Sequence, residues 1–316
     1  MKTTKAILVA AILAGSLFVE RGAQACTSFR LIAKDGTVVF GRTMEFAIDV
    51  HSDVIMVPRG YARTGTTPDG ENGMAWTAKY ACVGANGEGL PEIFDGGNEK
   101  GLALGVLYFP TMAGYMKYDA ATAAKTIAPW QVGTWILENC ATVEEVKQNI
   151  DKIVVADVVF KAWGFTPPLH YVVHDASGKC IVIEYVDCKL HVHDNPLGVM
   201  TNAPTFDWQM TNLRNYVGFS LVNRPPVVVG GVTLAPFGQG TGMLGMPGDF
   251  TPPSRFVRAV AFSTSAFTPK TGDDAVLEAF HLLNSFDIPK GAARKNTRMS
   301  MATTWPTTRF GLPSAT

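Results

Sequence analysis

The sequence predicts a layered α+β fold in one domain. Segments with strand patterning come first, a capped helix follows, three more strands come next, and helices dominate the later part of the chain. Strands and helices that occur in separate runs are typical of this class. We find no internal repeat, low-complexity tract or linker that would divide the 316 residues.

Charge and composition exclude several kinds of partner. The chain has 27 Lys plus Arg and 27 Asp plus Glu, so it has no net charge to attract nucleic acid or an acidic membrane surface. Hydrophobic residues make up 47% of the sequence, which is enough for a sizeable core. The N-terminal apolar run is too short for a stable membrane span, and no second apolar stretch reaches that length.

Residues 1–25 have the pattern of a secretory signal peptide. Two lysines precede an uncharged apolar run, and Ala23-Gln24-Ala25 supplies an A-x-A cleavage site. Cleavage there would leave a domain of residues 26–316, exported to the periplasm or secreted. Its first residue would be Cys26.

A cysteine at the start of a mature chain combines a nucleophile and a base. The free α-amino group has an unperturbed pKa of about 7.7–8.0, so part of it is unprotonated near neutral pH. An N-terminal amine activates a threonine nucleophile in this way, and the same logic applies to a thiol. From this segment alone, Cys26 could also be a lipid-attachment site, half of a disulfide or an ordinary small residue.

The first predicted element is a hairpin that turns at Asp35-Gly36. If these two residues form the whole loop, Cys26 lies opposite Glu45, with Cβ atoms about 4.5–5.5 Å apart. A carboxylate there could hold the α-amino group. The same register places Arg42 on the other face of the hairpin, so its contact with Cys26 would require a bulge or a strand end.

Alternation, capping and turn residues predict the remaining elements. Thr142-Val143-Glu144-Glu145 is a capping box that opens a helix ending near residue 151. The segment 88–100 is rich in glycine and acidic residues and is predicted to be a loop. Strands are expected at 77–84, 102–109, 169–174, 179–186, 189–193 and 198–201, and helices at 206–219, 254–262 and 273–286.

The other cysteines and the histidines give weak signals. Cys180 and Cys188 bracket a strand of about 26 Å. This is too long for a disulfide, whose two Cα atoms lie within about 7 Å of each other. Whether Cys82 and Cys140 form a disulfide stays open. A histidine could serve as base in a conventional Cys–His thiol hydrolase, although none stands in a known signature. The paired His191 and His193 lack further ligands at metal-binding spacing, and the glycine motif at 240–245 lacks the strand and helix of a dinucleotide site.

Asn202 ends a predicted strand and precedes a predicted helix. A side-chain N–H at such a position is well placed to stabilise an oxyanion. Taken alone, the position is no more than a turn signal.

Several segments together resemble the choloylglycine hydrolase family, which includes bile salt hydrolases and penicillin V acylases. They occur in the family's order from Cys26 to about Trp305, and an ordered set is far more specific than one motif. The segments are Cys26-Thr27-Ser28-Phe29, Phe40-Gly41-Arg42-Thr43-Met44-Glu45-Phe46, Asp95-Gly96-Gly97-Asn98-Glu99-Lys100-Gly101-Leu102, Leu107-Tyr108-Phe109-Pro110, Asn195-Pro196-Leu197-Gly198-Val199-Met200-Thr201-Asn202-Ala203-Pro204 and Ser254-Arg255-Phe256-Val257-Arg258.

The resemblance implies the four-layer αββα sandwich of the N-terminal nucleophile hydrolases. Cys26 would be the nucleophile and its α-amino group the base. Arg42 would lie near the sulfur, where a cation favours the thiolate. Glu45 occupies the family's Asp position and would hold the amine; it still offers a carboxylate, although one methylene longer.

The resemblance also implies an oxyanion hole made by Asn202 and the backbone N–H of Tyr108, with Arg255 completing the polar cluster. The reaction would be amide hydrolysis through an acyl-thioester, with no metal or cofactor. Family members typically continue after a Thr-x-Trp segment with further strands, whereas this chain ends soon after Trp305. The last strands of the sheet are therefore expected to be missing or altered. The resemblance implies assembly into a homotetramer, which the altered C-terminus would affect.

The substrate is predicted from one position and the apolar residues around it. Tyr108 stands where the family's bile salt hydrolases have Asn and its penicillin V acylases have Tyr. Met44, Phe46 and Tyr108 would line an apolar, aromatic pocket for a phenoxyacetyl group or an acyl chain. We expect a penicillin V acylase-like amidase, with N-acyl homoserine lactones as further substrates. Conjugated bile salts are the second candidate, and a non-catalytic lipoprotein anchored at Cys26 is the alternative of another class.

Overall fold

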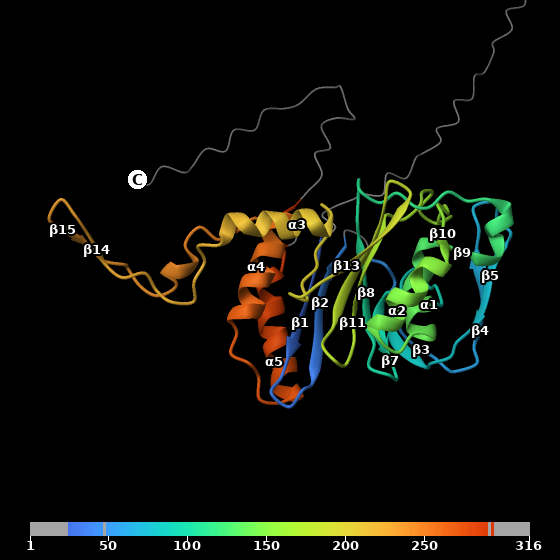
Figure 1. Cartoon of the computed structure of the whole chain (residues 1–316), viewed down its shortest axis with the longest axis horizontal. Helices are drawn as coiled ribbons and strands as arrows, with labels where there is room; N and C mark the ends of the chain where they lie inside the picture. The colour runs from blue at the N-terminus through green and yellow to red at the C-terminus, as the bar shows by residue number, and fades with distance from the viewer. Residues whose placement is uncertain (1–24, 47–48, 290–291, 294–316) are drawn as a thin grey trace, which may run out of the picture.

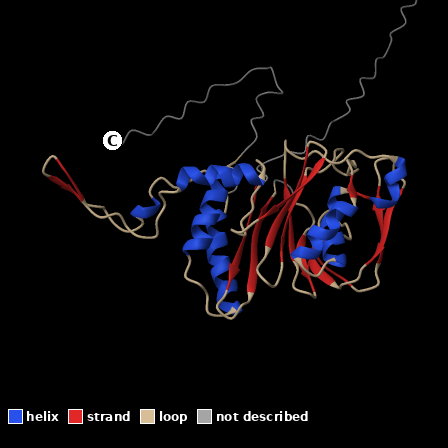
Figure 2. Cartoon of the chain, in the orientation of Figure 1, coloured by secondary structure: helices blue, strands red, loops and turns tan. Residues whose placement is uncertain are grey.

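Two β-sheets lie face to face between two layers of helices (Figures 1 and 2). This computed structural model describes residues 25–46, 49–289 and 292–293. The predicted signal segment up to residue 24 and the predicted departure from the family after residue 303 lie outside these ranges. The order of the layers is the αββα order that the resemblance implies.

The smaller sheet pairs β1 (Ala25–Ile32) with β2 (Val38–Glu45) in antiparallel fashion. Helices α4 (Pro252–Ser265) and α5 (Gly272–Leu283) cover its outer face, and α3 (Phe206–Asn212) runs across one end of α4 (Figure 1). Buried aromatic and aliphatic side chains from these strands and helices form one apolar cluster.

The larger sheet has seven strands in the order β13-β12-β11-β8-β7-β6-β3, and each neighbouring pair is antiparallel. Helices α1 (Val132–Asn139) and α2 (Val143–Asn149) cover the face turned away from β1 and β2 (Figure 1). The strands are β3 (Val54–Val57), β6 (Cys82–Ala85), β7 (Asp95–Asn98), β8 (Ala103–Tyr108), β11 (Leu169–His174), β12 (Cys180–Val186) and β13 (Lys189–Asp194).

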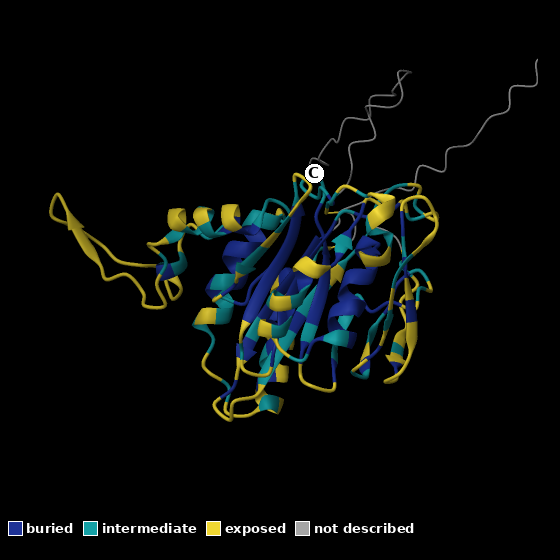
Figure 3. Ribbon diagram, turned by 45° about the vertical axis from the view of Figure 1, so that its right-hand side comes forward, coloured by how far each residue is buried: buried dark blue, intermediate teal, exposed yellow. Residues whose placement is uncertain are grey.

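Among the described residues, three short strand pairs lie outside the two sheets; two of them are antiparallel and one is parallel. One of them projects from the body on the side of α3 and α4 and is exposed to solvent (Figures 1 and 3). The pairs are β4 (Ala62–Thr66) with β5 (Asn72–Thr77), β9 (Thr126–Ile127) with β10 (Val154–Val155), and the projecting β14 (Val227–Val229) with β15 (Val232–Leu234).

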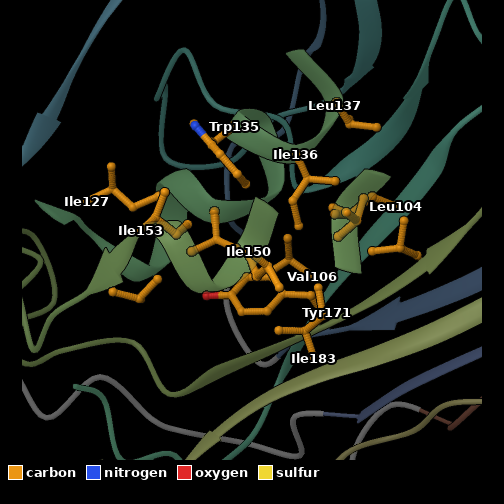
Figure 4. Close-up of a cluster of buried hydrophobic side chains, with 14 of the residues drawn as sticks. Leu104, Val106, Ile127, Trp135, Ile136, Leu137, Ile150, Ile153, Tyr171 and Ile183 are labelled. Carbon is orange, nitrogen blue, oxygen red and sulfur yellow. The ribbon is translucent and has the colours of Figure 1, made fainter. Parts of the chain in front are cut away.

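Strand β11 lies at the centre of the core. All its residues are buried, because helices cover one face of its sheet and the smaller sheet covers the other. Side chains alternate between the two faces: Tyr171 and Val173 pack into the cluster under α1 and α2, whereas Val172 packs toward β1. Figure 4 shows Tyr171 beside Ile183 in the first of these clusters.

Most predicted elements are confirmed. The strands expected at 102–109 and 169–193 are β8, β11, β12 and β13, and the three later helices are α3, α4 and α5. Half of the predicted capping box is present at α2, where the Thr142 hydroxyl accepts the Glu145 N–H at 3.1 Å. The Glu145 carboxylate accepts the N–H of Ala141, one residue before the N-cap, at 2.9 Å instead of the N–H of Thr142.

Three predicted segments are wrong in part. The expected strand at 77–84 is interrupted by a bend between β5 and β6, and the expected strand at 198–201 is a single bridge from Met200 to Ser28. The expected loop at 88–100 contains β7. Its glycines are required by packing: a Cβ on Gly96 would lie 2.7 Å from the Cα of Gly84 on the neighbouring strand. The sequence signal for a loop was therefore a signal for close contact between strands.

The predicted register of the first hairpin is also wrong by one residue. The loop has three residues, because Ala33 rather than Lys34 bonds Thr37, and Gly36 takes the left-handed conformation with φ 87°. Cys26 consequently lies opposite Met44, and Arg42 shares the face of Cys26 without any bulge. Glu45 lies opposite Ala25, on the face turned toward α4.

Within the described ranges, no helix is both long enough and apolar enough to cross a membrane.

Candidate active site

The thiol of Cys26 lies against the guanidinium of Arg42. Arg42 Nη2 is 3.2 Å from Cys26 Sγ and donates to the carbonyl of Val106 at 2.8 Å. Its other terminal nitrogen, Nη1, pairs with the carboxylate of Asp95. The cation is thus held at the sulfur by groups from the larger sheet, and a cation beside a cysteine favours the thiolate.

Asp95 is a site residue that the sequence reasoning did not assign. It belongs to one of the motifs of the resemblance, but it lies far along the chain from Arg42 and in a segment predicted to be a loop. Its position at the start of β7 brings it to the hairpin across the two sheets. An acidic residue at the head of a glycine-rich strand was the available signal.

Asn202 joins the backbone of Cys26 to a buried cation. Its Oδ1 accepts the Cys26 backbone N–H at 2.9 Å and Nη2 of Arg255 at 2.7 Å, and its Nδ2 donates to the carbonyl of Tyr108 at 2.7 Å. Because an amide nitrogen carries two hydrogens, Nδ2 has a second N–H in addition to the one directed at Tyr108.

Arg255 is fully buried and makes four directional contacts. It donates to the carbonyl of Cys26, to Thr27 Oγ1 at 2.8 Å, to Asn202 and to the carbonyl of Phe250 at 2.9 Å. Burial lowers the pKa of Arg255 to about 10, against the opposing charges of Cys26 and Glu45. The group therefore stays cationic at neutral pH.

Glu45 presents a buried carboxylate next to the start of the domain. Within the described residues, neither of its oxygens has a hydrogen-bond partner in good geometry. Burial raises the pKa of Glu45, while the hydroxyl of Thr43 and the charges of Arg255 and Arg42 oppose that rise. Its place opposite Ala25 puts this acceptor beside the chain where residue 26 begins. In this chain Ala25 is still attached, so the Cys26 nitrogen is a peptide N–H.

An apolar pocket opens beside the thiol. Its wall includes the three residues predicted to bind substrate, Met44, Phe46 and Tyr108, together with Phe94 and Trp163. The ring of Phe46 stacks on Trp163 with centroids 5.7 Å apart and meets Tyr108 edge-on at 5.9 Å. This arrangement suits a flat apolar group next to the nucleophile.

The weaker candidates lie elsewhere. All five cysteines are unbridged, and the 240–245 motif forms a 3-10 turn rather than a strand followed by a helix. His191 and His193 stack on each other at the sheet edge. Among the described residues, no group of three His, Cys, Asp or Glu side chains has the arrangement of a metal site.

Comparison with known proteins agrees with this geometry. Residues 26–310 match the family model of linear amide C–N hydrolases, choloylglycine hydrolase family. The chain belongs to this family. A choloylglycine hydrolase-family protein is a hydrolase of linear amide bonds, and its fold is that of the N-terminal nucleophile hydrolases.

Relatives of this family member include both activities that the resemblance suggested. It is 38% identical over 273 residues to a bile salt hydrolase/transferase of Clostridium perfringens, covering 85% of this chain and 81% of the relative. A variant of the conjugated bile acid hydrolase from the same organism has a solved structure with a TM-score of 0.75 at 35% identity, covering 85% of this chain and 81% of that one. The penicillin V acylase structure of Agrobacterium tumefaciens gives 0.69 at 28% identity, covering 84% and 74%.

Replacing Arg42 should slow the reaction of the Cys26 thiol. In Arg42→Met the cation is lost, so we expect iodoacetamide to label Cys26 about tenfold more slowly at pH 7. Mass spectrometry of the peptide that contains Cys26 measures the labelling rate. Arg30→Met is the matched control, because Arg30 lies on the same hairpin but bonds the carbonyls of Gly178 and Pro196.

A second substitution separates reactivity from folding. Arg42→Met leaves Asp95 without its partner, and adding Asp95→Asn removes that stranded charge. The double variant should regain thermal stability without regaining the labelling rate. A wild-type labelling rate in Arg42→Met would contradict the assigned role of this cation.

Glu45 should make the unprocessed chain less stable at neutral pH. Because burial raises the pKa of Glu45 above its unfolded value, the ionised form costs folding free energy at high pH and the cost disappears once both states are protonated. In the form that retains Ala25, Glu45→Gln should therefore raise the urea midpoint at pH 7, with the gain shrinking as the pH falls toward about 4.

The control for this substitution is Glu99, a carboxylate whose pKa is shifted in the opposite direction. Pairing with Arg59 lowers the pKa of Glu99 to about 2, so Glu99→Gln should leave the midpoint unchanged or slightly reduced at pH 7. A pH-independent effect of Glu45→Gln would show that the carboxylate charge is not the cause.

Proposed function

We propose that this protein is an exported amidase that uses Cys26, freed as the N-terminal residue, to hydrolyse amides of a bulky apolar acid. The observation that carries the proposal is that both the thiol and the backbone nitrogen of Cys26 have close polar partners. Its thiol is 3.2 Å from a guanidinium nitrogen of Arg42, and its backbone nitrogen is 2.9 Å from Asn202 Oδ1. These partners suit a thiolate and an amine.

The proposed reaction has two halves. The α-amino group takes the thiol proton, and the thiolate attacks the amide carbon while Asn202 and the Tyr108 backbone N–H stabilise the developing oxyanion. The α-ammonium then protonates the leaving nitrogen, the C–N bond breaks, and the acyl group remains as a thioester on Cys26. Water, deprotonated by the same amine, attacks the thioester and releases the acid and the thiol.

Two buried charges would support the amine and the oxyanion donor. Glu45 offers the α-ammonium group an acceptor and a counter-charge. Arg255 holds Oδ1 of Asn202 at 2.7 Å, which directs the amide nitrogen toward the carbonyl of Tyr108. The removal of the signal segment at residues 1–25 is part of the same proposal, because it alone creates the base.

The aromatic wall of the pocket supports a flat acyl group. Phe46, Tyr108 and Trp163 form this wall beside the thiol, so phenoxyacetyl amides such as penicillin V are the first candidate substrates. N-acyl homoserine lactones would place their acyl chain in the same pocket. Conjugated bile salts are the second candidate, supported by the 38% identity to a bile salt hydrolase/transferase.

Two other interpretations of Cys26 predict different outcomes. A lipoprotein would carry an acylated N-terminus, which the intact mass would show. A Cys–His thiol hydrolase would need an imidazole at the sulfur, whereas the residues described around the pocket include no histidine.

The projecting hairpin supports an oligomer, which by family resemblance would be a homotetramer. Five apolar side chains on β14 and β15 are each more than half exposed, and an isolated two-stranded hairpin is marginal in water. We propose that a second copy of the chain covers this surface. The five residues are Val227, Val228, Val229, Val232 and Leu234.

A side-by-side assay tests the proposed function. Protein that begins at Cys26 is expected to release the acid from penicillin V faster than from glycocholate or a long-chain N-acyl homoserine lactone, because of the aromatic wall. The same protein with residues retained ahead of Cys26 should be inactive, since it has no α-amine at that residue. Its intact mass provides the control that the first form is unmodified.

The outcomes separate the alternatives. A faster reaction with glycocholate moves the substrate to the conjugated bile salts, and equal activity of the extended form removes the N-terminal mechanism. Release of none of the three acids by protein with a confirmed free Cys26 rejects the proposed substrates.

The hairpin is tested by charge insertion. Val228→Asp with Val232→Asp should shift the protein to a smaller species in size-exclusion chromatography with light scattering. Val54→Asp is the matched control, because Val54 is 79% exposed on a strand of the body. An unchanged assembly in the double variant, or a monomeric wild type, would contradict the proposed contact.

A further inference from the structure

A buried His170–Glu184 pair lies outside the proposed catalytic steps. His170 on β11 and Glu184 on β12 are almost completely buried, with Nδ1 of the histidine 3.3 Å from Oε1 of the glutamate. The imidazole also stacks on the ring of Phe109 with centroids 4.2 Å apart. Charged groups this deep in a core require directional partners.

The histidine holds the chain just before Asn202. Its Nε2 lies 2.9 Å from the carbonyl oxygen of Thr201. A carbonyl oxygen only accepts, so Nε2 is the donor in this contact, while Nδ1 faces the carboxylate of Glu184. The ring is therefore fixed at both nitrogens, and its direction fixes Thr201.

The glutamate holds the chain just after Asn202. Both of its oxygens accept the backbone N–H of Phe206, at 3.0 and 3.2 Å. Phe206 is the first residue of α3, where Thr205 makes no side-chain capping bond. Glu184 thus satisfies a helix-start N–H that would otherwise be an unpaired buried donor.

The two residues together anchor both ends of segment 201–206. Asn202 lies within it and is held further by Gln209 Nε2, which is 3.4 Å from the Asn202 carbonyl. His193 Nε2 is 3.8 Å from the second oxygen of Glu184, so a third strand also contacts the pair. A side chain that must present an N–H to an oxyanion depends on the position of its backbone.

We propose that His170 and Glu184 are positioning residues that set the direction of the Asn202 side chain for catalysis. This inference rests on the proposed oxyanion role of Asn202. The pair touches neither the thiol nor the pocket, so its effect passes through segment 201–206.

His170→Phe tests the proposal because it keeps a ring and removes both nitrogens. We expect kcat to fall about tenfold to hundredfold with KM unchanged, since a misplaced oxyanion donor affects only the transition state. Iodoacetamide labelling of Cys26 should keep the wild-type rate. The matched control is His174→Phe: His174 lies on the same strand and is equally buried, but it contacts the ring of Phe40.

Variants of Glu184 supply a second measurement that does not depend on the folding of His170→Phe. Glu184→Gln retains an acceptor for Phe206 and a donor for Nδ1, so it should retain most of the activity. Glu184→Ala should lower kcat as His170→Phe does. Equal losses in Gln and Ala variants of similar thermal stability would overturn the positioning role.

A double-mutant cycle with Asn202→Ala decides the route. If His170 acts through Asn202, His170→Phe lowers kcat in the wild type but adds little in the Asn202→Ala background. A full additional loss overturns the positioning inference and leaves the amidase mechanism intact. If Asn202→Ala alone has the wild-type kcat, the proposed oxyanion role is overturned, and this inference with it. If the wild-type protein with a free Cys26 hydrolyses none of the substrates, the proposed function itself is rejected.

Discussion

The guanidinium of Arg42 links the two sheets through polar contacts. It extends from β2 and contacts the thiol on β1, the Val106 carbonyl on β8 and the Asp95 carboxylate on β7. Removing a cation from water costs several kcal/mol, so these partners must all be in place. A shift of one sheet against the other breaks at least one of these contacts. The environment of Cys26 therefore depends on sheet packing and not on the conformation of a loop.

A second buried cation connects the helical layer to the same residue. Arg255 on α4 reaches the carbonyl of Cys26 and the side chain of Asn202. Opposite charges accompany both cations: Asp95 pairs with Arg42, and the buried Glu45 lies within electrostatic range of Arg255. With His170 behind segment 201–206, polar groups from both sheets and from α4 converge on one cysteine.

Runs rich in apolar and β-branched residues made most of the larger sheet predictable from sequence. Strands such as β11 and β12 are such runs, and Thr142 caps the start of α2, so these elements could be located. Strand β7 could not be located from the sequence. Its glycines are needed for close packing between strands, but in the sequence they resemble the glycines of a loop.

The arrangement of the site was less predictable. The register of the hairpin depends on whether its loop has two or three residues. Asp35-Gly36 is compatible with both lengths, so the sequence did not decide the register. The resemblance identified Arg42, Asn202 and Arg255 as neighbours of Cys26, but the partner of Arg42 depends on a contact between distant strands. Asp95 could be assigned only once β7 was placed.

The burial of Ala25 has a consequence for the proposed removal of residues 1–25. Ala25 is 3% exposed and lies in β1, paired with Glu45, so the bond between Ala25 and Cys26 is covered on both sides once the sheets have formed. A protease requires an accessible, unpaired stretch of chain, and a buried strand offers one only through local unfolding. In the folded protein this bond is protected by the same layers that organise the thiol. The proposed cleavage at this position would therefore have to precede the docking of the first strand.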